Sequence, residues 1–325
     1  MRIGFTYPFN RYWKEQTEPL IRQFPQYEFV TDRESALKEI HTFDILVGGI
    51  EPKGVYEQAT AVQAVFVPFV GVDHLPADLF IQRRVRVFNS HGNARYVAER
   101  TLSLLLCCTG KVLEYHNDLA KGVWHGWVGK GLKDTWDSIV GYTITLLGTG
   151  AIATWIARYV KLFDCKVIGY KKRRVAEKLL DFDEIRYDFA EAVKPADVVI
   201  STLPLTEETR GLLGKKELFL LKDKILINVG RGEVIDEEAL YVALKEGVLK
   251  AAGIDTWYSY PSKGEASHMP SRFPFQELPN VVLSPHVGGF TPKAIQENMK
   301  VTLSNLEAYL LGKPVPNEVD LRRLY

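Results

Sequence analysis

The chain has 325 residues, of which 46 % are hydrophobic, and a formal net charge of +1. This length and apolar fraction suffice for a sizeable core and predict two domains. The small net charge provides no overall field for a nucleic acid or a membrane surface, and no apolar run reaches the roughly 20 residues of a membrane helix. The N-terminus lacks a signal-peptide h-region and the three cysteines form no spaced pair, so we expect a cytoplasmic protein with reduced thiols.

Short β-rich runs alternate with helical patterns along the whole chain. The strands expected in the first third are Arg2–Tyr7, Tyr27–Thr31, Phe43–Gly49, Val62–Phe69 and Val85–Asn89. Those expected further along are Tyr142–Gly148, Lys166–Tyr170, Ile185–Tyr187, Asp197–Thr202, Lys224–Gly230, Ala251–Thr256 and Val281–Ser284. Many of these runs are continuously apolar, which is typical of parallel strands covered on both faces. Their alternation with helices predicts right-handed βαβ units in doubly wound α/β domains.

Two segments depart from this alternation. One long helix is expected over about Ala94–Ala120, and its apolar side chains on nearly every face predict burial, partly against another subunit. The stretch Tyr258–Pro279 is rich in Pro, Ser and Gly and is expected to be an irregular surface excursion between two strands.

A glycine fingerprint follows the first strand of the second set. Gly148–Ala153 reads G-x-G-x-x-A and leads into a helix expected at Trp155–Leu162. Gly148 permits the tight turn, Gly150 lets the backbone approach a pyrophosphate, and Ala153 lets the helix pack closely on the strand. Free N–H groups at the helix N-terminus favour the anion. We therefore expect dinucleotide binding, with phosphate contacts from Gly148, Thr149, Gly150, Ala151 and Ile152.

A basic cluster follows the next strand, at the position where NAD sites usually place an acid for a ribose hydroxyl. Its residues are Lys171, Lys172, Arg173 and Arg174. A carboxylate there would repel a 2′-phosphate, whereas cations attract it. The cluster therefore favours NADP over NAD, and the alternative interpretation is an exposed charged turn.

Further segments carry a resemblance to a known family. They are Val97–Glu99, Leu203–Arg210, Ile227–Asp236, Ala252–Asp255 and Ser284–Gly289. In this order and spacing, together with the fingerprint, the sequence resembles the D-isomer-specific 2-hydroxyacid dehydrogenase family over nearly the whole chain. Glyoxylate and hydroxypyruvate reductases are the members that we expect it to resemble most.

The resemblance implies a domain organisation. A Rossmann cofactor domain, residues 92–286, is inserted in a discontinuous flavodoxin-like substrate-binding domain, residues 1–91 plus 287–325. It also implies a cleft between the two domains and a homodimer held by the cofactor domains. The family needs NAD or NADP and a small 2-keto or 2-hydroxy acid, but no metal.

The resemblance also assigns site residues. Arg231 matches the catalytic arginine, whose planar fork suits a carboxylate, and His286 matches the acid/base that exchanges the hydroxyl proton; both also bind substrate. Val70 and Gly71 match the loop whose N–H groups receive the substrate carboxylate. Asp255 matches the residue that binds the nicotinamide carboxamide. The other cofactor residues that the resemblance implies are Leu203, Pro204, Thr209, Val229, Gly230 and Gly288.

One position departs from the family pattern. The family's third catalytic residue is usually a glutamate five positions after the equivalent of Asp255, and here that position holds Tyr260. Three interpretations stay open. The hydroxyl of Tyr260 holds His286 without charging it, Glu265 folds back to replace the carboxylate, or catalysis is weak and the protein chiefly binds cofactor.

The function expected on these grounds is the interconversion of a small D-2-hydroxy acid and its 2-keto acid by hydride transfer, and the keto acids that the resemblance suggests are glyoxylate and hydroxypyruvate. The alternative is a cofactor-sensing interaction protein similar to the corepressors of the same family, and a lower-ranked one is a formate or phosphonate dehydrogenase.

Overall fold

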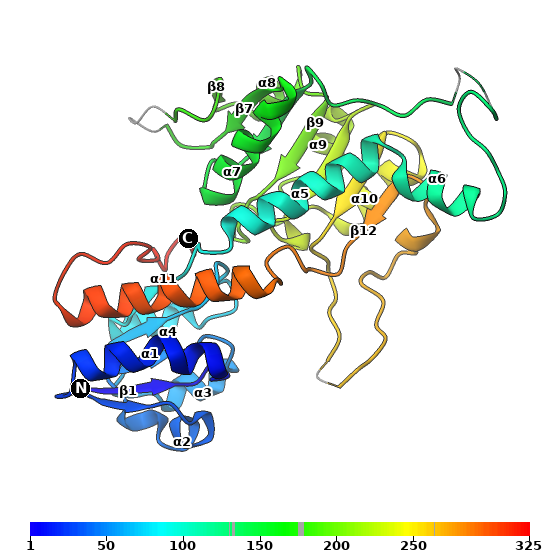
Figure 1. The fold of residues 1–325 in the computed structure, drawn as a ribbon. Helices are drawn as coiled ribbons and strands as arrows, with labels where there is room; N and C mark the ends of the chain where they lie inside the picture. Colours follow the sequence, from blue (N-terminus) through cyan, green and yellow to red (C-terminus); the bar gives the residue numbers. More distant parts are fainter. Residues whose placement is uncertain (130, 132–133, 175–178, 263) are drawn as a thin grey trace. The chain divides into compact units, whose positions relative to one another are not determined.

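The computed structural model describes residues 1–129, 131, 134–174, 179–262 and 264–325. The chain divides into two compact units (Figure 1). Unit 1 comprises Met1–Asn93 and Phe290–Tyr325, and unit 2 comprises Ala94–Gly289. The contacts therefore divide the chain two to three residues after the boundaries expected from the sequence, 91/92 and 286/287.

Unit 1 contains a five-stranded, all-parallel sheet with the order β2-β1-β3-β4-β5, which is the flavodoxin-like order. Its strands are β1 (Arg2–Phe5), β2 (Glu28–Val30), β3 (Ile45–Val47), β4 (Ala64–Phe66) and β5 (Arg86–Phe88). Its helices are α1 (Arg11–Gln23), α2 (Arg33–Lys38), η1 (Ile40–Thr42), α3 (Lys53–Gln58), α4 (Ala77–Arg83) and α11 (Pro292–Leu310). The expected strands, and the doubly wound parallel sheet that they predict, are confirmed.

Both faces of this sheet are buried. On β3, Ile45 and Val47 join one hydrophobic cluster, while Leu46 between them joins the other. The first cluster includes Trp13 of α1 and Met299 of α11, two helices that lie side by side (Figure 1). The last helix of the chain therefore completes the layer that covers the N-terminal sheet, which makes unit 1 discontinuous in sequence.

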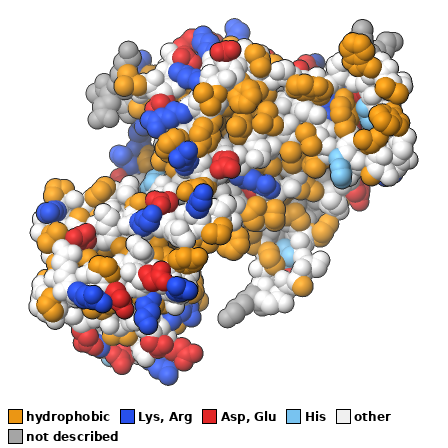
Figure 2. Space-filling model, in the orientation of Figure 1, with side chains coloured by type: hydrophobic (Ala, Val, Ile, Leu, Met, Phe, Trp, Pro, Cys, Tyr) orange, Lys and Arg blue, Asp and Glu red, His pale blue; other side chains and the backbone are white. Residues whose placement is uncertain are grey.

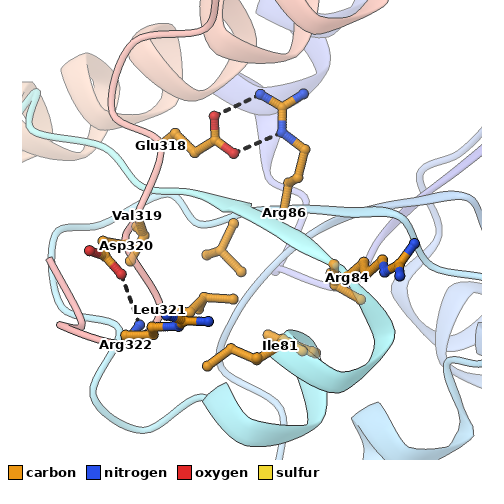
Figure 3. Close-up of a pocket in the computed structure, with 11 residues that line it drawn as sticks. Ile81, Arg84, Arg86, Glu318, Val319, Asp320, Leu321 and Arg322 are labelled. Carbon is orange, nitrogen blue, oxygen red and sulfur yellow. Dashed lines mark hydrogen bonds and ion pairs between the residues drawn. The ribbon is translucent and has the colours of Figure 1, made fainter.

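The C-terminal segment covers the open edge of β5. Glu318 forms an antiparallel bridge with Phe88, and the Val319 N–H donates to Val87 O at 2.8 Å. The fork of Arg86 donates two hydrogen bonds of 2.8 and 2.7 Å to the carboxylate of Glu318 (Figure 3). The surface pocket drawn in Figure 3 lies between this segment, β5 and the end of α4. An edge strand that would otherwise be open to pairing is thereby protected.

Unit 2 contains a seven-stranded, all-parallel sheet with the order β12-β11-β10-β9-β6-β7-β8. Its strands are β6 (Thr143–Leu147), β7 (Lys166–Tyr170), β8 (Glu184–Arg186), β9 (Val198–Ser201), β10 (Ile225–Asn228), β11 (Ala251–Ile254) and β12 (Val281–Leu283). Its helices are α5 (Ala94–Thr109), α6 (Val112–Leu119), α7 (Ala151–Val160), η3 (Lys161–Phe163), α8 (Phe189–Val193), α9 (Lys215–Leu220), η4 (Gly232–Val234), α10 (Glu237–Lys245) and η5 (Phe275–Glu277). This is the Rossmann order with one additional strand, and the order reverses between β6 and β9.

The continuous apolar runs of this sheet have the expected cause. On β9, Val198 and Ile200 belong to the cluster formed with α5 and α7, whereas Val199 belongs to the cluster on the opposite face. All three are fully buried. Because successive side chains of a strand point to opposite faces, a run that is apolar at every position requires helices on both sides.

Two helix predictions were inaccurate. The single helix expected over Ala94–Ala120 is two helices, because the chain turns at Gly110 and at Lys111, whose φ is 48°. The helix after the fingerprint begins at Ala151, not at Trp155, because Gly150 is its N-cap residue and the fingerprint is already helical. In the described part of the chain, no helix has the length and hydrophobicity that crossing a membrane requires.

Candidate active site

The turn after β6 has the geometry that a dinucleotide needs. Gly148 has a φ of 96°, and a Cβ at this position would lie 2.9 Å from Thr202 Oγ1. Any side chain would therefore be strained both by the backbone conformation and by contact with the loop after β9. The fingerprint thus sits at the point where the strand order reverses, which is where open α/β sheets bind ligands.

The start of α7 offers room for an anion. Gly150 is the N-cap residue, and a Cβ built on it would meet no atom within 4 Å. Ala153, by contrast, is completely buried between helix and sheet. The first N–H groups of a helix have no partner within it, and the helix dipole favours negative charge there. The open backbone at Gly150, followed by these N–H groups, fits a pyrophosphate.

The loops after β9 and β10 contact each other beside this turn. A Cβ on Gly230 would lie 2.4 Å from Leu203 O. The hydroxyl of Thr209 donates to Pro204 O at 2.7 Å and fixes the turn that follows β9. The structure therefore brings together four of the expected cofactor residues, and Val229 lies directly before Gly230 on the same loop.

The basic cluster after β7 is engaged with its surroundings. Lys172 Nζ and Arg173 Nη2 lie 3.3 and 3.2 Å from the two carboxylate oxygens of Glu208. The guanidinium of Arg174 lies 5.5 Å from the centre of the Tyr187 ring. Lys171, half-buried, is held through its backbone N–H by Arg186 O. The cluster is therefore a cationic turn at the carboxyl end of β7 that forms ion pairs with one acid, Glu208.

Arg231 follows β10 at the same edge of the sheet. Its backbone carbonyl accepts a hydrogen bond of 2.9 Å from Asn228 Nδ2, and its Nη1 donates to Gly230 O at 2.9 Å. A Cβ on Gly232 would lie 2.3 Å from Trp257 O, so the backbone beyond Arg231 is pressed against the loop after β11. The half-buried guanidinium is thereby anchored at the end of a buried strand.

Asp255 organises the loop that carries His286. Its side chain is 2 % exposed and accepts hydrogen bonds from Val287 N at 3.1 Å, from Gly288 N at 2.9 Å, and from the hydroxyl of Ser284. These contacts hold His286 in the left-handed region with a φ of 55°. A non-glycine residue in that region is uncommon and indicates a loop fixed by its surroundings. Binding of a nicotinamide carboxamide by Asp255 stays a prediction.

Tyr260 lies against His286, and its hydroxyl is influenced by the charge of Arg231. Its ring centre is 5.5 Å from that of His286, with the planes tilted by 50°. Its hydroxyl accepts a hydrogen bond of 3.0 Å from Trp257 N. Burial raises the pKa of Tyr260 above its usual range, and the positive charge of Arg231 opposes this effect only in part. The residue at the family's glutamate position is therefore a neutral phenol in contact with the imidazole ring.

Glu265 is occupied within its own loop. One carboxylate oxygen accepts a hydrogen bond of 2.9 Å from Ser262 N, and the other lies 3.0 Å from His268 Nδ1. The second nitrogen of His268 lies 2.6 Å from the hydroxyl of Ser259. These contacts favour a role for Glu265 in shaping the excursion that presents Tyr260, in place of a carboxylate folded back on His286.

Two residues of this site were not anticipated from the sequence. Arg100 of α5 donates hydrogen bonds of 3.2 and 2.9 Å from Nε and Nη2 to the hydroxyl of Ser284. That hydroxyl donates to Asp255, and Ser284 O accepts from Trp257 Nε1 at 2.8 Å. The available signal was an arginine directly after Val97–Glu99 on an otherwise apolar helix. Arg100 and Ser284 are positioning residues for the His286 loop.

The expected substrate loop lies in unit 1. Val70 and Gly71 follow β4, at the carboxyl edge of that unit's sheet, and both are half-buried. Val70 O accepts a hydrogen bond of 2.8 Å from Asn89 Nδ2, and Phe69 O accepts one of 3.2 Å from Ser90 N. The loop is therefore tied to the end of β5, and its role in binding a carboxylate stays a prediction.

Gly288 is expected to tolerate no side chain. A Cβ there would lie 2.9 Å from Asp255 Oδ2, the oxygen that accepts the Gly288 N–H. Gly288→Ala should displace the loop, lower the stability of the protein by about 1–3 kcal/mol, and reduce kcat more than cofactor affinity. Denaturant unfolding and cofactor titration measure the two effects. Gly54→Ala, on α3 where a Cβ meets no atom within 4 Å and the backbone is not in the left-handed region, is the control for a glycine substitution. An unchanged kcat in Gly288→Ala would contradict the role given to this loop.

Comparison with known proteins is consistent with this geometry. Residues 102–288 match the family described as D-isomer specific 2-hydroxyacid dehydrogenase, NAD binding domain. The chain is 32 % identical to glyoxylate/hydroxypyruvate reductase B of Pectobacterium atrosepticum over 276 residues, 84 % of this chain and 83 % of that protein. It is 29 % identical to D-3-phosphoglycerate dehydrogenase of Methanocaldococcus jannaschii over 89 % of this chain, and spans only 54 % of that relative's length.

Among solved structures, the chain resembles an acyclic imino acid reductase in complex with NADPH and D-Arg. The TM-score is 0.77 at 26 % sequence identity, and the match covers 98 % of this chain and 100 % of the other.

Proposed function

Because the chain belongs to the D-isomer specific 2-hydroxyacid dehydrogenase family, and so to the NAD(P)-dependent oxidoreductases, we propose that Arg231 and His286 interconvert a small 2-keto acid and its D-2-hydroxy acid. Glyoxylate and hydroxypyruvate are the proposed substrates, since a relative that is 32 % identical is named for them. A cofactor-sensing protein without catalysis is not favoured.

One observation supports the proposal most strongly. Arg231 follows β10 and His286 follows β12, and Tyr260 follows β11, the strand that lies between these two in the sheet. Its ring packs on His286, and the charge of Arg231 acts on its hydroxyl. A fixed cation and an imidazole at one edge of the same sheet are what carbonyl reduction next to a carboxylate needs.

The mechanism follows from the two side chains. Gly148, Gly150 and the N-terminus of α7 would hold the pyrophosphate of a nicotinamide dinucleotide, which would supply the hydride in reduction and accept it in oxidation. The guanidinium of Arg231 binds the substrate carboxylate and stabilises negative charge on the carbonyl oxygen as reduction proceeds. Protonated His286 donates its proton to that oxygen, and neutral His286 removes the hydroxyl proton in the reverse direction. Asp255 holds the backbone that presents His286.

We assign NADP as the preferred cofactor. The support is the cationic turn Lys171–Arg174 at the end of β7, where a carboxylate would select against a 2′-phosphate. A cytoplasmic location is also part of the proposal, since Cys107, Cys108 and Cys165 are free thiols.

A cofactor-oxidation screen tests the activity. NADPH and NADH are followed separately with glyoxylate, hydroxypyruvate, pyruvate, phenylpyruvate and longer 2-keto acids, with Arg231→Ala as the blank. We expect oxidation of NADPH with at least one short keto acid and none in the blank. Absence of oxidation across the whole panel would contradict the enzymatic proposal, and a clear preference for NADH would contradict the cofactor assignment.

A homodimer through unit 2 is the proposed assembly. A surface around α6, which we call the α6 surface, carries exposed hydrophobic side chains (Figure 2). Its residues are Val112, Leu113, Leu119, Val123, Trp124, Trp127 and Val128. Trp127 is 94 % exposed and Val128 77 %. Exposed apolar side chains that include two tryptophans are typical of a protein interface, because aromatic side chains dominate the binding energy of such surfaces.

Trp127→Glu should weaken the dimer by at least a hundred-fold in Kd, because it places a charge at the most exposed apolar side chain of the α6 surface. Sedimentation velocity across a concentration series measures the change. Phe219→Glu on α9, where the native side chain is 64 % exposed, is the control for a charge on another apolar surface and should leave the oligomeric state unaltered. A monomeric native protein, or a Trp127→Glu variant that still dimerises normally, would refute this interface.

A further inference from the structure

Glu208 forms ion pairs with the basic cluster at the end of β7. Its two carboxylate oxygens are divided between Lys172 Nζ, at 3.3 Å, and Arg173 Nη2, at 3.2 Å. Hydrogen bonding and the charges of these two cations hold the pKa of Glu208 below its usual range. The carboxylate is therefore ionised at any ordinary assay pH and neutralises part of the cluster that is expected to receive a 2′-phosphate.

The loop that carries Glu208 is held in place by its own hydrogen bonds. Thr206 N donates to Thr209 Oγ1 at 2.8 Å, Thr209 N donates to Thr206 Oγ1 at 3.2 Å, and Arg210 N donates to Thr206 O at 2.9 Å. Thr209 Oγ1 also donates to Pro204 O, next to the loop that follows β10. Glu208 is thus presented to the cations from a turn that is fixed by its own hydrogen bonds, and its position does not depend on the ion pairs alone.

The ion pairs themselves are solvated. The side chains of Lys172, Arg173 and Glu208 are 66, 47 and 51 % exposed. Ion pairs this exposed contribute little to stability, so their loss would cost the fold little and leave both cations free to bind another anion. A phosphate monoester carries up to two negative charges near neutral pH, and it would have to share the same two cations with a fixed carboxylate.

We infer that Glu208 is a specificity-determining residue, a built-in counter-ion that competes with the 2′-phosphate of NADP for Lys172 and Arg173. This inference rests on the proposed role of the basic cluster in cofactor binding. Glu208 thereby reduces the discrimination between NADPH and NADH that four consecutive cations would otherwise give. Removing its charge, while keeping its shape, should raise affinity for ligands with the 2′-phosphate and leave affinity for those without it unchanged.

The experiment measures binding of cofactor fragments by titration calorimetry, so that it does not depend on turnover. Adenosine 2′,5′-bisphosphate probes the site with the phosphate, and adenosine 5′-monophosphate probes it without. Glu208→Gln should bind the bisphosphate about five- to ten-fold more tightly than the native protein, with the monophosphate affinity changed less than two-fold. Intact NADPH and NADH should follow the same pattern, and the gain should shrink as salt is raised.

Glu207→Gln is the matched control. It removes the same charge one residue away, from an exposed glutamate that, among the described residues, forms no ion pair. If Glu207→Gln and Glu208→Gln raise the affinity for the bisphosphate equally, the effect comes from the overall charge of the surface and not from competition at Lys172 and Arg173. That result would overturn the inference. Weaker bisphosphate binding in Glu208→Gln would also overturn it, because Glu208 would then organise the cations for the phosphate. So would a gain for the monophosphate as large as that for the bisphosphate.

The inference and the proposed cofactor fail differently. If Lys172→Ala and Arg173→Ala bind the bisphosphate as tightly as the native protein does, the basic cluster does not receive the 2′-phosphate and the NADP assignment fails. If both variants weaken bisphosphate binding while Glu208→Gln has no effect, the assignment of NADP stands and Glu208 has no part in selectivity.

Discussion

Replacing Arg231 with alanine should lower kcat/KM for the keto acid by about a thousand-fold, with cofactor affinity nearly unchanged. The guanidinium is anchored at the end of β10, where it can bind the substrate carboxylate and oppose the charge that develops on the carbonyl oxygen. Removing one preorganised charge stabiliser of this kind typically costs about 10²–10³ in rate. Loss of the carboxylate contact adds to this through KM.

Two companion variants make the result specific. Arg231→Lys keeps the charge but loses the planar fork, and should recover only a small part of the activity. Arg210→Ala removes an exposed arginine of the same unit, which pairs with Glu233 at 2.7 Å, and should leave kcat/KM within two-fold. Steady-state kinetics with saturating cofactor measure all three. A fully active Arg231→Ala protein would remove the cation from the reaction and with it the proposed chemistry.

The sequence predicted the architecture well because the architecture depends on patterns local in the chain. Val198–Ile200 is apolar at every position, and a strand with that pattern requires a helix layer on each face. The G-x-G-x-x-A turn is also explained locally, since Gly148 adopts a φ of 96° that other residues rarely reach. Fold class, strand positions and the family therefore followed from the sequence.

The details of the site depend on contacts between distant segments, which the sequence does not display. The hydroxyl of Ser284 joins Arg100 to Asp255 across 184 and 29 positions of the chain. Glu208 pairs with Lys172 across 36 positions of the chain and neutralises part of a cluster that, in the sequence alone, is simply cationic. The departure at Tyr260 could be located by counting from Asp255, but its environment could not. Only the structure shows that its hydroxyl accepts the Trp257 N–H and that its ring packs on His286.

Tyr260→Glu should move the high-pH limit of the reduction reaction upward by about one pH unit. Reduction needs protonated His286, so its rate is lost as pH rises through the pKa of that imidazole. Burial raises the pKa of Tyr260, so the native phenol stays neutral in an ordinary assay and gives the imidazolium no counter-charge. A carboxylate at this position, beside a ring whose centre is now 5.5 Å from that of Tyr260, would favour the protonated imidazole.

The oxidation reaction tests the direction of the shift in the pKa of His286. It needs neutral His286, so the same substitution should move its low-pH limit upward as well and slow oxidation at neutral pH while reduction persists to higher pH. Tyr260→Gln, which is polar but uncharged, should leave both limits in place and separates charge from the loss of the ring. The measurement is kcat/KM against pH in both directions, with cofactor affinity as a check on folding. If both limits stay where they are in Tyr260→Glu, the neutral phenol does not set the protonation of His286, and the interpretation of Tyr260 as a substitute for the family's carboxylate fails.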